Sequence, residues 1–510
     1  GDSPRTGGGG GGGDGGGGGD GGGRGAGADA ARFSEECRAV TMRSRVLEQE
    51  LRETRAQLQS VQERRATASI VLRHMQDEEA AAAARRAEAE VTASATARAQ
   101  WREWEAAARR EEAAAEAAAA QATEAAMEAA RRAAAGEGGE AVMVMLERKS
   151  TTQAMAAGVP PERRQLVDVS PVEQFKATKN AAEVEGLVSA GRKDAAAIVS
   201  YFAWLQAKLG GCATVTEAEG ADELSRRRAA MPGAVGNSFP TISSTGANAA
   251  IIHYQAAHGA CSDIAPGAVY LCDSGGQYRD GTTDVTRTLH FEIEGPPTED
   301  ERRAYTRVLQ GHINLATAVF PAGTPGLMLE MLSREPLWQD GLNFLHGTGH
   351  GMGAYLNVHE GPAGIGGGAA HISQVNEARR RMYLHPIEEG FYLSDEPGFY
   401  SEGAFGIRIE ADLVVQPAET RYAWGSRPFL GFRYCTPVPF CPALIDVSLL
   451  TPAQRAWVDA HHARCREEVA AGLLRHAARG GGAASDAEIK ADVARALAWL
   501  EAATKLLPPV

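Results

Sequence analysis

Four stretches of strand-like sequence carry acidic residues at positions where their neighbours predict burial. The acidic residues are Asp273 in VYLCDSGG, Asp284 in TTDVTRTLHF, Glu396 in YLSDEPGFY and Glu410 in FGIRIEADLVV. A carboxylate in a buried strand is costly unless it is paired or binds a cation, and neighbouring carboxylates repel each other unless a cation lies between them. A strand-end position would explain any one of them, but it explains the whole set poorly. The sequence therefore predicts strands that converge on a shared cation site.

A glycine-rich stretch supplies imidazoles for the same site. FLHGTGHGMGAYLNVHEGP contains His346, His350 and His359, and its glycines let the backbone approach other segments closely. We interpret His350 as the single imidazole ligand, with His346 and His359 as groups that hydrogen-bond the substrate or the metal ligands. His253 in AAIIHYQ is a further candidate, expected on a strand beside the Asp273 strand, with a purely structural role as the alternative.

The predicted ligand set determines which metals suit it. The negative charges of the carboxylates are balanced by two divalent cations, and such a pair can activate a water molecule. The oxygen-rich set favours manganese, with cobalt or zinc as alternatives. Cys272 precedes Asp273 on its strand, so side-chain alternation directs the thiol to the opposite face and no cysteine is needed as a ligand.

The order of the predicted elements indicates an α+β fold built from two similar halves. A long helix over 180–209, capped by Asn180, precedes the first group of strands. Helical sequence over 299–320 precedes the second group. We expect the site to lie in a cleft between the two halves.

Composition divides the chain into four segments. The first is rich in glycine and is expected to be disordered. The second is rich in Ala, Glu and Arg, which favours a helix but provides little apolar surface for packing. We interpret this helix as a solvated arm, with a partner-binding coiled coil as the alternative. The expected boundaries are a tail over 1–30, a helical arm over 31–135, a linker over 136–167 and a catalytic domain over 168–510.

Charge and cysteine usage restrict the partners and the compartment. The net charge of −13 argues against a nucleic-acid-binding protein, and no apolar run is long enough to span a membrane. The cysteines form no CxxC pair, so we interpret them as reduced thiols. This usage favours a cytoplasmic protein, with an organellar form as the alternative.

Five motifs between residues 170 and 507 together resemble the catalytic domain of the cytosolic-type Xaa-Pro aminopeptidase (aminopeptidase P) family, which has the pita-bread metallopeptidase fold. The motifs are GNSFPTISSTGANAAIIHY, DSGGQYRDGTTDVTRTLHF, HGTGHGMGAYLNVHEGP, DEPGFY and EGAFGIRIE. The resemblance implies that two metal ions are held by Asp273, Asp284, His350, Glu396 and Glu410. It also implies removal of the N-terminal residue from peptides whose second residue is proline, with Glu396 as the proton shuttle.

The resemblance assigns further residues to the site. It implies that His253, His346 and His359 bind the substrate and handle protons. Arg408 matches an arginine that pairs with a ligand carboxylate, and Tyr400 matches an active-site tyrosine. It also makes a homodimer through the catalytic domain an expectation, while any partner of the helical arm stays unspecified.

The sequence departs from this family pattern in two places. Family members carry two further N-terminal domains where this chain has a glycine tract and an Ala-rich helix. The stretch over 365–389 is longer than the corresponding family loop and lies at the rim of the expected site. Three alternatives therefore stay open: a prolidase-like dipeptidase, a catalytically weak enzyme, and a metal-free scaffold that binds partners.

Overall fold

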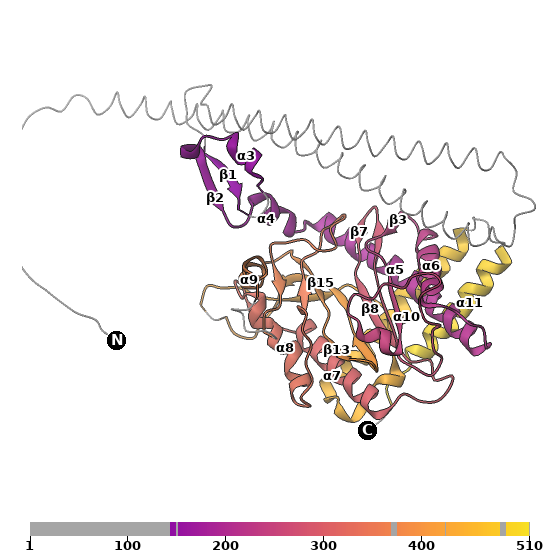
Figure 1. The fold of residues 1–510 in the computed structure, drawn as a ribbon. Helices are drawn as coiled ribbons and strands as arrows, with labels where there is room; N and C mark the ends of the chain where they lie inside the picture. Colours follow the sequence, from indigo (N-terminus) through magenta and orange to yellow (C-terminus); the bar gives the residue numbers. More distant parts are fainter. Residues whose placement is uncertain (1–142, 149–150, 369–374, 424, 480–485, 509–510) are drawn as a thin grey trace, which may run out of the picture. The chain divides into compact units, whose positions relative to one another are not determined.

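The structure is a computed structural model that describes residues 143–148, 151–368, 375–423, 425–479 and 486–508 (Figure 1). The tail predicted over 1–30 and the helical arm predicted over 31–135 lie outside the described residues. The candidate site lies within one compact unit, made of residues 145–156 and 164–510.

Short elements occupy part of the segment that the sequence predicted as a linker. They are β1 (Val144–Glu147), α3 (Gln153–Ala157), the 3-10 helix η1 (Pro161–Arg163) and β2 (Arg164–Val167). β1 and β2 pair as a two-stranded sheet. The next helix, α4 (Pro171–Ala177), begins at Ser170, whose hydroxyl accepts the Val172 N–H at 3.2 Å.

The long helix α5 (Ala181–Gly210) begins where the sequence predicted it, because Asn180 caps it. The Asn180 side chain accepts two N–H groups of the first turn at 3.0 Å. Glu183 Oε2 in turn accepts the Asn180 N–H at 2.9 Å, which completes a capping box. The next helix, α6 (Glu217–Ala229), starts with a capping box of the same kind at Thr216.

The first half places its strands in two small sheets. One sheet has the order β4-β5-β8 and the other the order β3-β6-β7. In the antiparallel register of β5 and β8, Asp273 lies opposite Thr286, so these two side chains share a face. The elements are β3 (Ala234–Asn237), β4 (Ile242–Thr245), the 3-10 helix η2 (Gly246–Ala250), β5 (Tyr270–Ser274), β6 (Gly276–Tyr278), β7 (Gly281–Thr282) and β8 (Val285–Leu289).

The second half repeats the order of helices followed by strands, as predicted. Its largest sheet has the order β12-β15-β16-β9, and β10-β11 and β13-β14 form separate antiparallel pairs. The helices are α7 (Glu299–Ala316), α8 (Gly326–Trp338) and α9 (Glu377–Leu384). The strands are β9 (Phe320–Pro321), β10 (Gly349–His350), β11 (Gly364–Ile365), β12 (Tyr392–Asp395), β13 (Gly398–Ser401), β14 (Phe405–Arg408), β15 (Ala411–Pro417) and β16 (Phe429–Tyr434).

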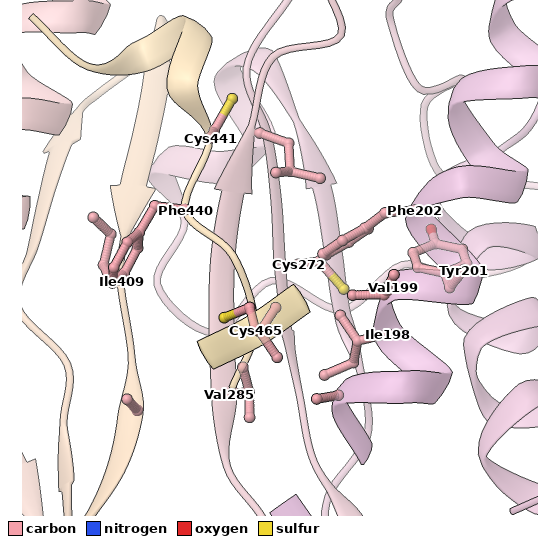
Figure 2. Packing of buried hydrophobic residues seen from close by; sticks show 14 of the residues in the cluster. Ile198, Val199, Tyr201, Phe202, Cys272, Val285, Ile409, Phe440, Cys441 and Cys465 are labelled. Carbon is pink, nitrogen blue, oxygen red and sulfur yellow. The ribbon is translucent and has the colours of Figure 1, made fainter. Parts of the chain in front are cut away.

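A shared hydrophobic core joins the first half to the C-terminal helices. After the 3-10 helices η3 (Pro442–Leu444) and η4 (Val447–Leu449), α10 (Pro452–Arg479) and α11 (Asp486–Ala503) pack on α5 (Figure 1). Ile198, Val199 and Phe202 of α5 lie close to Cys272 of β5 in this core (Figure 2). Cys272 is only 2% exposed, so it lies in the core as the alternation predicted.

The two halves meet where β8 runs beside the segment between β14 and β15. The Glu410 N–H donates to the Thr286 carbonyl at 3.1 Å. The guanidinium of Arg287, which is fully buried, donates to the carbonyls of Glu410 and Val438 at 2.7 Å each. Several carbonyl acceptors compensate the burial of this charge. We call this contact between the halves the seam.

The strand predicted for AAIIHYQ is wrong. Residues 246–250 form η2, His253 lies in the turn that follows, and the strand beside β5 is β4. Ser243 and Ser244 of β4 are fully buried because their hydroxyls bond the Tyr270 hydroxyl at 2.8 Å and a β5 carbonyl at 3.2 Å. Ile251, in contrast, is 54% exposed. The strand thus contains three buried hydroxyl residues, whereas the apolar Ile251 lies in the turn.

Two expectations from composition can be compared with the described residues. Within them, no helix is long and apolar enough to cross a membrane. The cysteines that the structure describes are free thiols, as predicted: Cys212, Cys261, Cys272, Cys435, Cys441 and Cys465.

Candidate metal centre

Five potential ligands from both halves converge at the seam. Asp273 lies in β5, Asp284 directly precedes β8, His350 ends β10, Glu396 directly follows β12 and Glu410 directly precedes β15. The first half therefore contributes two carboxylates, and the second half contributes two carboxylates and the imidazole. These are the residues that the sequence predicted to lie together.

The donor atoms of these side chains are spaced as ligands of a cation are spaced. His350 Nε2 lies 3.4 Å from Asp284 Oδ2 and 3.5 Å from Glu396 Oε1. One ligand atom each of Asp284, His350 and Glu410 lie within 4.8 Å of one another. Donor atoms at about 2.1 Å from one hard cation are roughly 3 Å apart, so the observed separations are close to those of a coordinated set.

Asp273 is oriented by an arginine that leaves one of its oxygens free. Arg408 Nη2 donates to Asp273 Oδ2 at 2.5 Å, and Arg408 Nε donates to the Thr286 hydroxyl at 3.1 Å. The Thr286 hydroxyl donates in turn to Glu410 Oε2 at 2.6 Å. Asp273 Oδ1 is buried and has no hydrogen-bond partner in the described residues. A buried carboxylate oxygen without a partner is costly, so this atom indicates a missing ligand.

Burial and mutual repulsion raise the pKa of three candidate ligands. The pKa of Asp284 is held well above its ordinary value, first by burial and then by the charge of Asp273. Burial and the charge of Asp284 likewise raise the pKa of Glu410. Burial raises the pKa of Glu396, although the nearby His350 opposes this shift. The cluster therefore favours any positive charge that enters it.

The backbone fixes the tautomer of His350. Its Nδ1 lies 3.1 Å from the Gly351 carbonyl, which can only accept, so Nδ1 carries the proton and Nε2 presents a lone pair to the carboxylates. The loop must be glycine-rich to reach this position. A Cβ on Gly349 would lie 2.0 Å from the Ser394 carbonyl oxygen, and a Cβ on Gly351 would lie 2.1 Å from that of Glu360. This close packing confirms the interpretation of the glycines.

A hydrogen-bonded chain leads from Asp273 to His346. Arg408 Nη1 donates to the Tyr400 hydroxyl at 2.8 Å, and this hydroxyl lies 2.9 Å from His346 Nε2. His346 Nδ1 lies 2.7 Å from the Gly347 carbonyl and must donate to it, so Nε2 accepts from Tyr400. Burial and the charge of Arg408 lower the pKa of His346 to about 3. Burial raises the pKa of Tyr400 to about 12, so both groups are neutral at pH 7.

The remaining two predicted histidines are His359 and His253. The ring of His359 is 4.1 Å from that of His350 in an edge-on arrangement. Burial, followed by the charges of His350 and His253, lowers the pKa of His359 to about 4. His253 lies in the turn after η2, which packs against β13 and β14, the strands that carry Tyr400 and Arg408. The structure thus brings His346, His350 and His359 to the site, and His253 lies in a turn whose preceding helix packs on these strands.

Sequence reasoning missed a buried ion pair on α8. This pair supports the loop that carries His346, His350 and His359, which we call the histidine loop. Arg334 Nη2 lies 2.6 Å from Glu330 Oε1, and both side chains are fully buried. Arg334 also donates to the carbonyls of Phe344 at 2.6 Å and His346 at 2.8 Å. The i, i+4 spacing of an acid and a base in LMLEMLSREPLW was a usable signal, but an exposed pair has the same spacing.

The residues present fit divalent metal ions. They offer four carboxylates, one imidazole with its lone pair directed inward, and a buried carboxylate oxygen without a partner. Hard oxygen donors with a single imidazole suit manganese, cobalt or zinc. The arrangement can therefore bind cations and orient water for hydrolysis.

Comparison with known proteins agrees with this chemistry. Metallopeptidase family M24 matches residues 185–417, and the C-terminal region of peptidase M24 matches residues 428–507. A probable Xaa-Pro aminopeptidase P of Arthroderma otae is 50% identical over 300 residues, which are 59% of this chain and 46% of that protein. The namesake protein of Fusarium vanettenii is 51% identical over 296 residues, which are 58% of this chain and 46% of that protein. The chain thus spans about half the length of these curated relatives.

A solved structure agrees with the fold. It is an X-prolyl aminopeptidase from Caenorhabditis elegans, described as a cytosolic enzyme with a di-nuclear active site. It is 36% identical in sequence, superposes with a TM-score of 0.63, and covers 73% of this chain and 55% of its own. The predicted pita-bread fold is therefore confirmed for the two-halved domain. Through residues 185–417 and 428–507, the chain belongs to metallopeptidase family M24.

Proposed function

We propose that this chain contains the metallopeptidase domain of an Xaa-Pro aminopeptidase, which removes the N-terminal residue from peptides with proline in second position. The observation that carries the proposal is the convergence of Asp284, His350 and Glu410 on one point at the seam. Relatives about 50% identical bear the name of this activity, which supports the choice of substrate.

We further propose that the site holds two divalent cations, with manganese as the natural metal. The ligands would be Asp273, Asp284, His350, Glu396 and Glu410. The C. elegans enzyme is described as di-nuclear, which supports the number. When bound, the cations supply Lewis acidity and make a water molecule nucleophilic at neutral pH.

The groups around the ligands keep the carboxylates in place for catalysis. Arg408 holds Asp273 through Oδ2, so that Oδ1 stays directed into the site. The Thr286 hydroxyl holds Glu410 through Oε2 in the same way. Because Arg408 and Thr286 also contact each other at 3.1 Å, the orientations of the two carboxylates are coupled across the seam.

Glu396 is the proposed proton carrier. Burial raises its pKa, so it accepts and releases a proton more readily near neutral pH than an exposed glutamate does. In the proposed reaction it takes a proton from the attacking water and delivers it to the proline nitrogen. This nitrogen needs the proton in order to leave, because an unprotonated amine anion is a very poor leaving group.

The neutral histidines are suited to donate hydrogen bonds to the substrate. His359, whose pKa is lowered to about 4, can donate from its N–H without carrying a charge that repels the cations. We propose that His359 and His253 contact the carbonyl oxygen on which negative charge develops. Tyr400 orients His346 through a hydrogen bond to its Nε2. We propose that His346 in turn positions the neighbouring loop residues that contact the substrate.

Hydrolysis of Arg-Pro-Pro by the purified chain, measured with added Mn(II) and after chelation, tests the proposal. We expect release of free arginine that depends on the metal. The Asp273→Asn variant should lack this activity, whereas Asp300→Asn, which changes an exposed carboxylate on α7, should retain it.

The same assay distinguishes the competing functions. Cleavage of X-Pro dipeptides in preference to X-Pro-Y tripeptides would indicate a prolidase-like dipeptidase instead. A chain that binds metal stoichiometrically but cleaves neither substrate would contradict the proposed activity. Absence of bound metal in the intact chain would indicate a scaffold.

A further inference from the structure

A buried glutamate outside the metal centre forms hydrogen bonds with several parts of the loop that carries His253. Glu217 is the first residue of α6 and is 0% exposed. Its carboxylate accepts four groups, all of them from residues 245–262. They are the Thr245 N–H at 2.8 Å, the Asn248 side-chain amide at 3.1 Å, the Tyr254 hydroxyl at 2.6 Å and the Ser262 N–H at 3.0 Å.

These contacts hold the beginning, the middle and the end of the loop at one point. Thr245 ends β4, and Ser262 precedes the return of the chain to β5. The Glu217 N–H also donates to the Ser262 carbonyl at 3.0 Å. A fully buried carboxylate requires donors of this kind, and a single anion that accepts from several parts of a loop fixes their relative positions. The loop is thus organised around Glu217.

The middle contact lies next to His253. Tyr254, which follows His253 directly, gives the shortest of the hydrogen bonds to Glu217. The His253 side chain is exposed, so the direction of its ring depends on the backbone turn that carries it. The 3-10 helix η2, which leads into this turn, packs against β13 and β14, the strands that carry Tyr400 and Arg408. Any movement of the turn would therefore displace the His253 ring.

We infer that Glu217 is a positioning residue, which holds the loop over 245–262 and thereby fixes the turn that carries His253. The inference rests on the proposed function insofar as His253 contacts the substrate. Nothing in Glu217 itself reaches the ligands, so its effect on turnover passes through the loop.

The test uses Glu217→Gln and the matched control Glu219→Gln. The glutamine amide would direct an N–H toward groups that are themselves donors, so it cannot keep all the contacts. Glu219 lies on the same turn of α6, but within the part of the chain that the structure describes its carboxylate bonds only Thr216. We expect Glu217→Gln to lower kcat on an X-Pro-Y tripeptide about 10- to 100-fold, the range expected for a displaced catalytic group. Glu219→Gln should lower the melting temperature and leave kcat within about twofold.

A double-mutant cycle with His253→Ala separates positioning from a general loss of structure. If Glu217 acts through His253, Glu217→Gln should have little further effect on kcat in the His253→Ala background. Metal content should equal that of the parent in all these variants. An equal fold-loss of kcat in both backgrounds, or an unchanged kcat in the single variant, would overturn the inference. If Glu217→Gln does not fold, Tyr254→Phe removes only the bonds of the Tyr254 hydroxyl to Glu217 and Asn248 and should show the same dependence on His253.

Hydrogen exchange keeps this test independent of the proposed function. Glu217→Gln should speed amide exchange within residues 246–262 and leave β5 and β8 unchanged. The same exchange rate in the variant and the parent would overturn the positioning role. A parent chain without X-Pro hydrolysis but with faster exchange in the variant would contradict the proposed function alone.

Discussion

Replacing Arg334 by methionine separates the support of the histidine loop from the chemistry of the site. Arg334 is fully buried on α8, with its guanidinium carbon 3.7 Å from the centre of the Phe344 ring. It pairs with Glu330 at 2.6 Å and donates to the carbonyls of Phe344 and His346. Methionine keeps most of the apolar packing and removes every one of these polar contacts.

The expected loss of stability follows from what the substitution leaves behind. Glu330 is also fully buried, and breaking a buried ion pair by removing one partner costs about 3–5 kcal/mol. Two loop carbonyls lose a donor as well, at about 1–3 kcal/mol for each group that finds no new partner. These costs overlap because the loop relaxes, so we expect the free energy of unfolding to fall by about 4 kcal/mol. The double variant Glu330→Gln/Arg334→Met, which has no unpaired charge, should regain about half of this.

Turnover should behave differently from stability. The carbonyl of His346 stays without its donor in both variants, so kcat on Arg-Pro-Pro should fall about tenfold or more in each. Urea unfolding gives the stability, and kcat is measured under conditions where each variant is folded. Arg307→Met is the matched control, because it breaks the pair at 2.7 Å between Arg307 of α7 and Asp340, which follows α8, without removing a hydrogen bond to the histidine loop. A double variant that regained both stability and kcat would refute the reasoning.

Three further predictions concern the ligands, the hydrogen-bonded chain and the response to acid. Asp273→Asn removes a charge that the cations need, so both bound metal and activity should be lost; full activity at unchanged metal content would exclude Asp273 from the site. Tyr400→Phe leaves a buried Arg408 N–H without its acceptor, so unfolding free energy should fall by about 1–3 kcal/mol and kcat should fall at unchanged metal content; a loss of metal would show that Tyr400 supports the ligands instead. Burial lowers the pKa of His462 from 6.5 to about 4, so below pH 6.5 the unfolded chain binds a proton that the folded chain does not. The contribution of His462 to the free energy of unfolding is therefore fully present above pH 6.5 and is lost as the pH falls toward 4. Lowering the pH from 7 to 5 should reduce the free energy of unfolding of the parent by about 2 kcal/mol more than that of His462→Gln. Urea unfolding at both pH values measures this difference.

The convergence of the four candidate carboxylates was predictable because each of them breaks a local pattern. An acidic residue among β-branched neighbours is an anomaly that a cation explains, and the structure places Asp273, Asp284, Glu396 and Glu410 together. The start of α5 was predictable for a similar reason, since a capping box is formed by residues close in sequence, here Asn180 and its helix.

The position of His253 was mispredicted because burial in β4 depends on distant partners. The serines of this strand are buried only because the hydroxyl of Tyr270 and a β5 carbonyl satisfy them, and the sequence of β4 alone does not show these partners. Glu330 and Arg334 escaped notice for the same physical reason. Their spacing is visible, but the loop carbonyls that make Arg334 important come from another segment.

The seam between the halves also determines the order in which this site can form during folding. The Thr286–Glu410 hydrogen bond joins residues 124 positions apart, and the Arg287–Val438 bond joins residues 151 positions apart. Contacts across such long loops form late, because closing the loop costs entropy before any contact compensates it. Each half can bring its own carboxylates together early, but the five candidate ligands meet only after the seam closes.

Selective metal capture should therefore accompany the slowest refolding phase. Stopped-flow refolding with a metal-sensitive dye would detect this, and uptake of metal in the fastest phase would contradict it. Neither half alone presents the complete set of donor atoms, so a partly folded chain should bind any metal only weakly and should release an ill-suited one. Because of this long-range topology, tight and selective metal binding should occur only after the domain has folded.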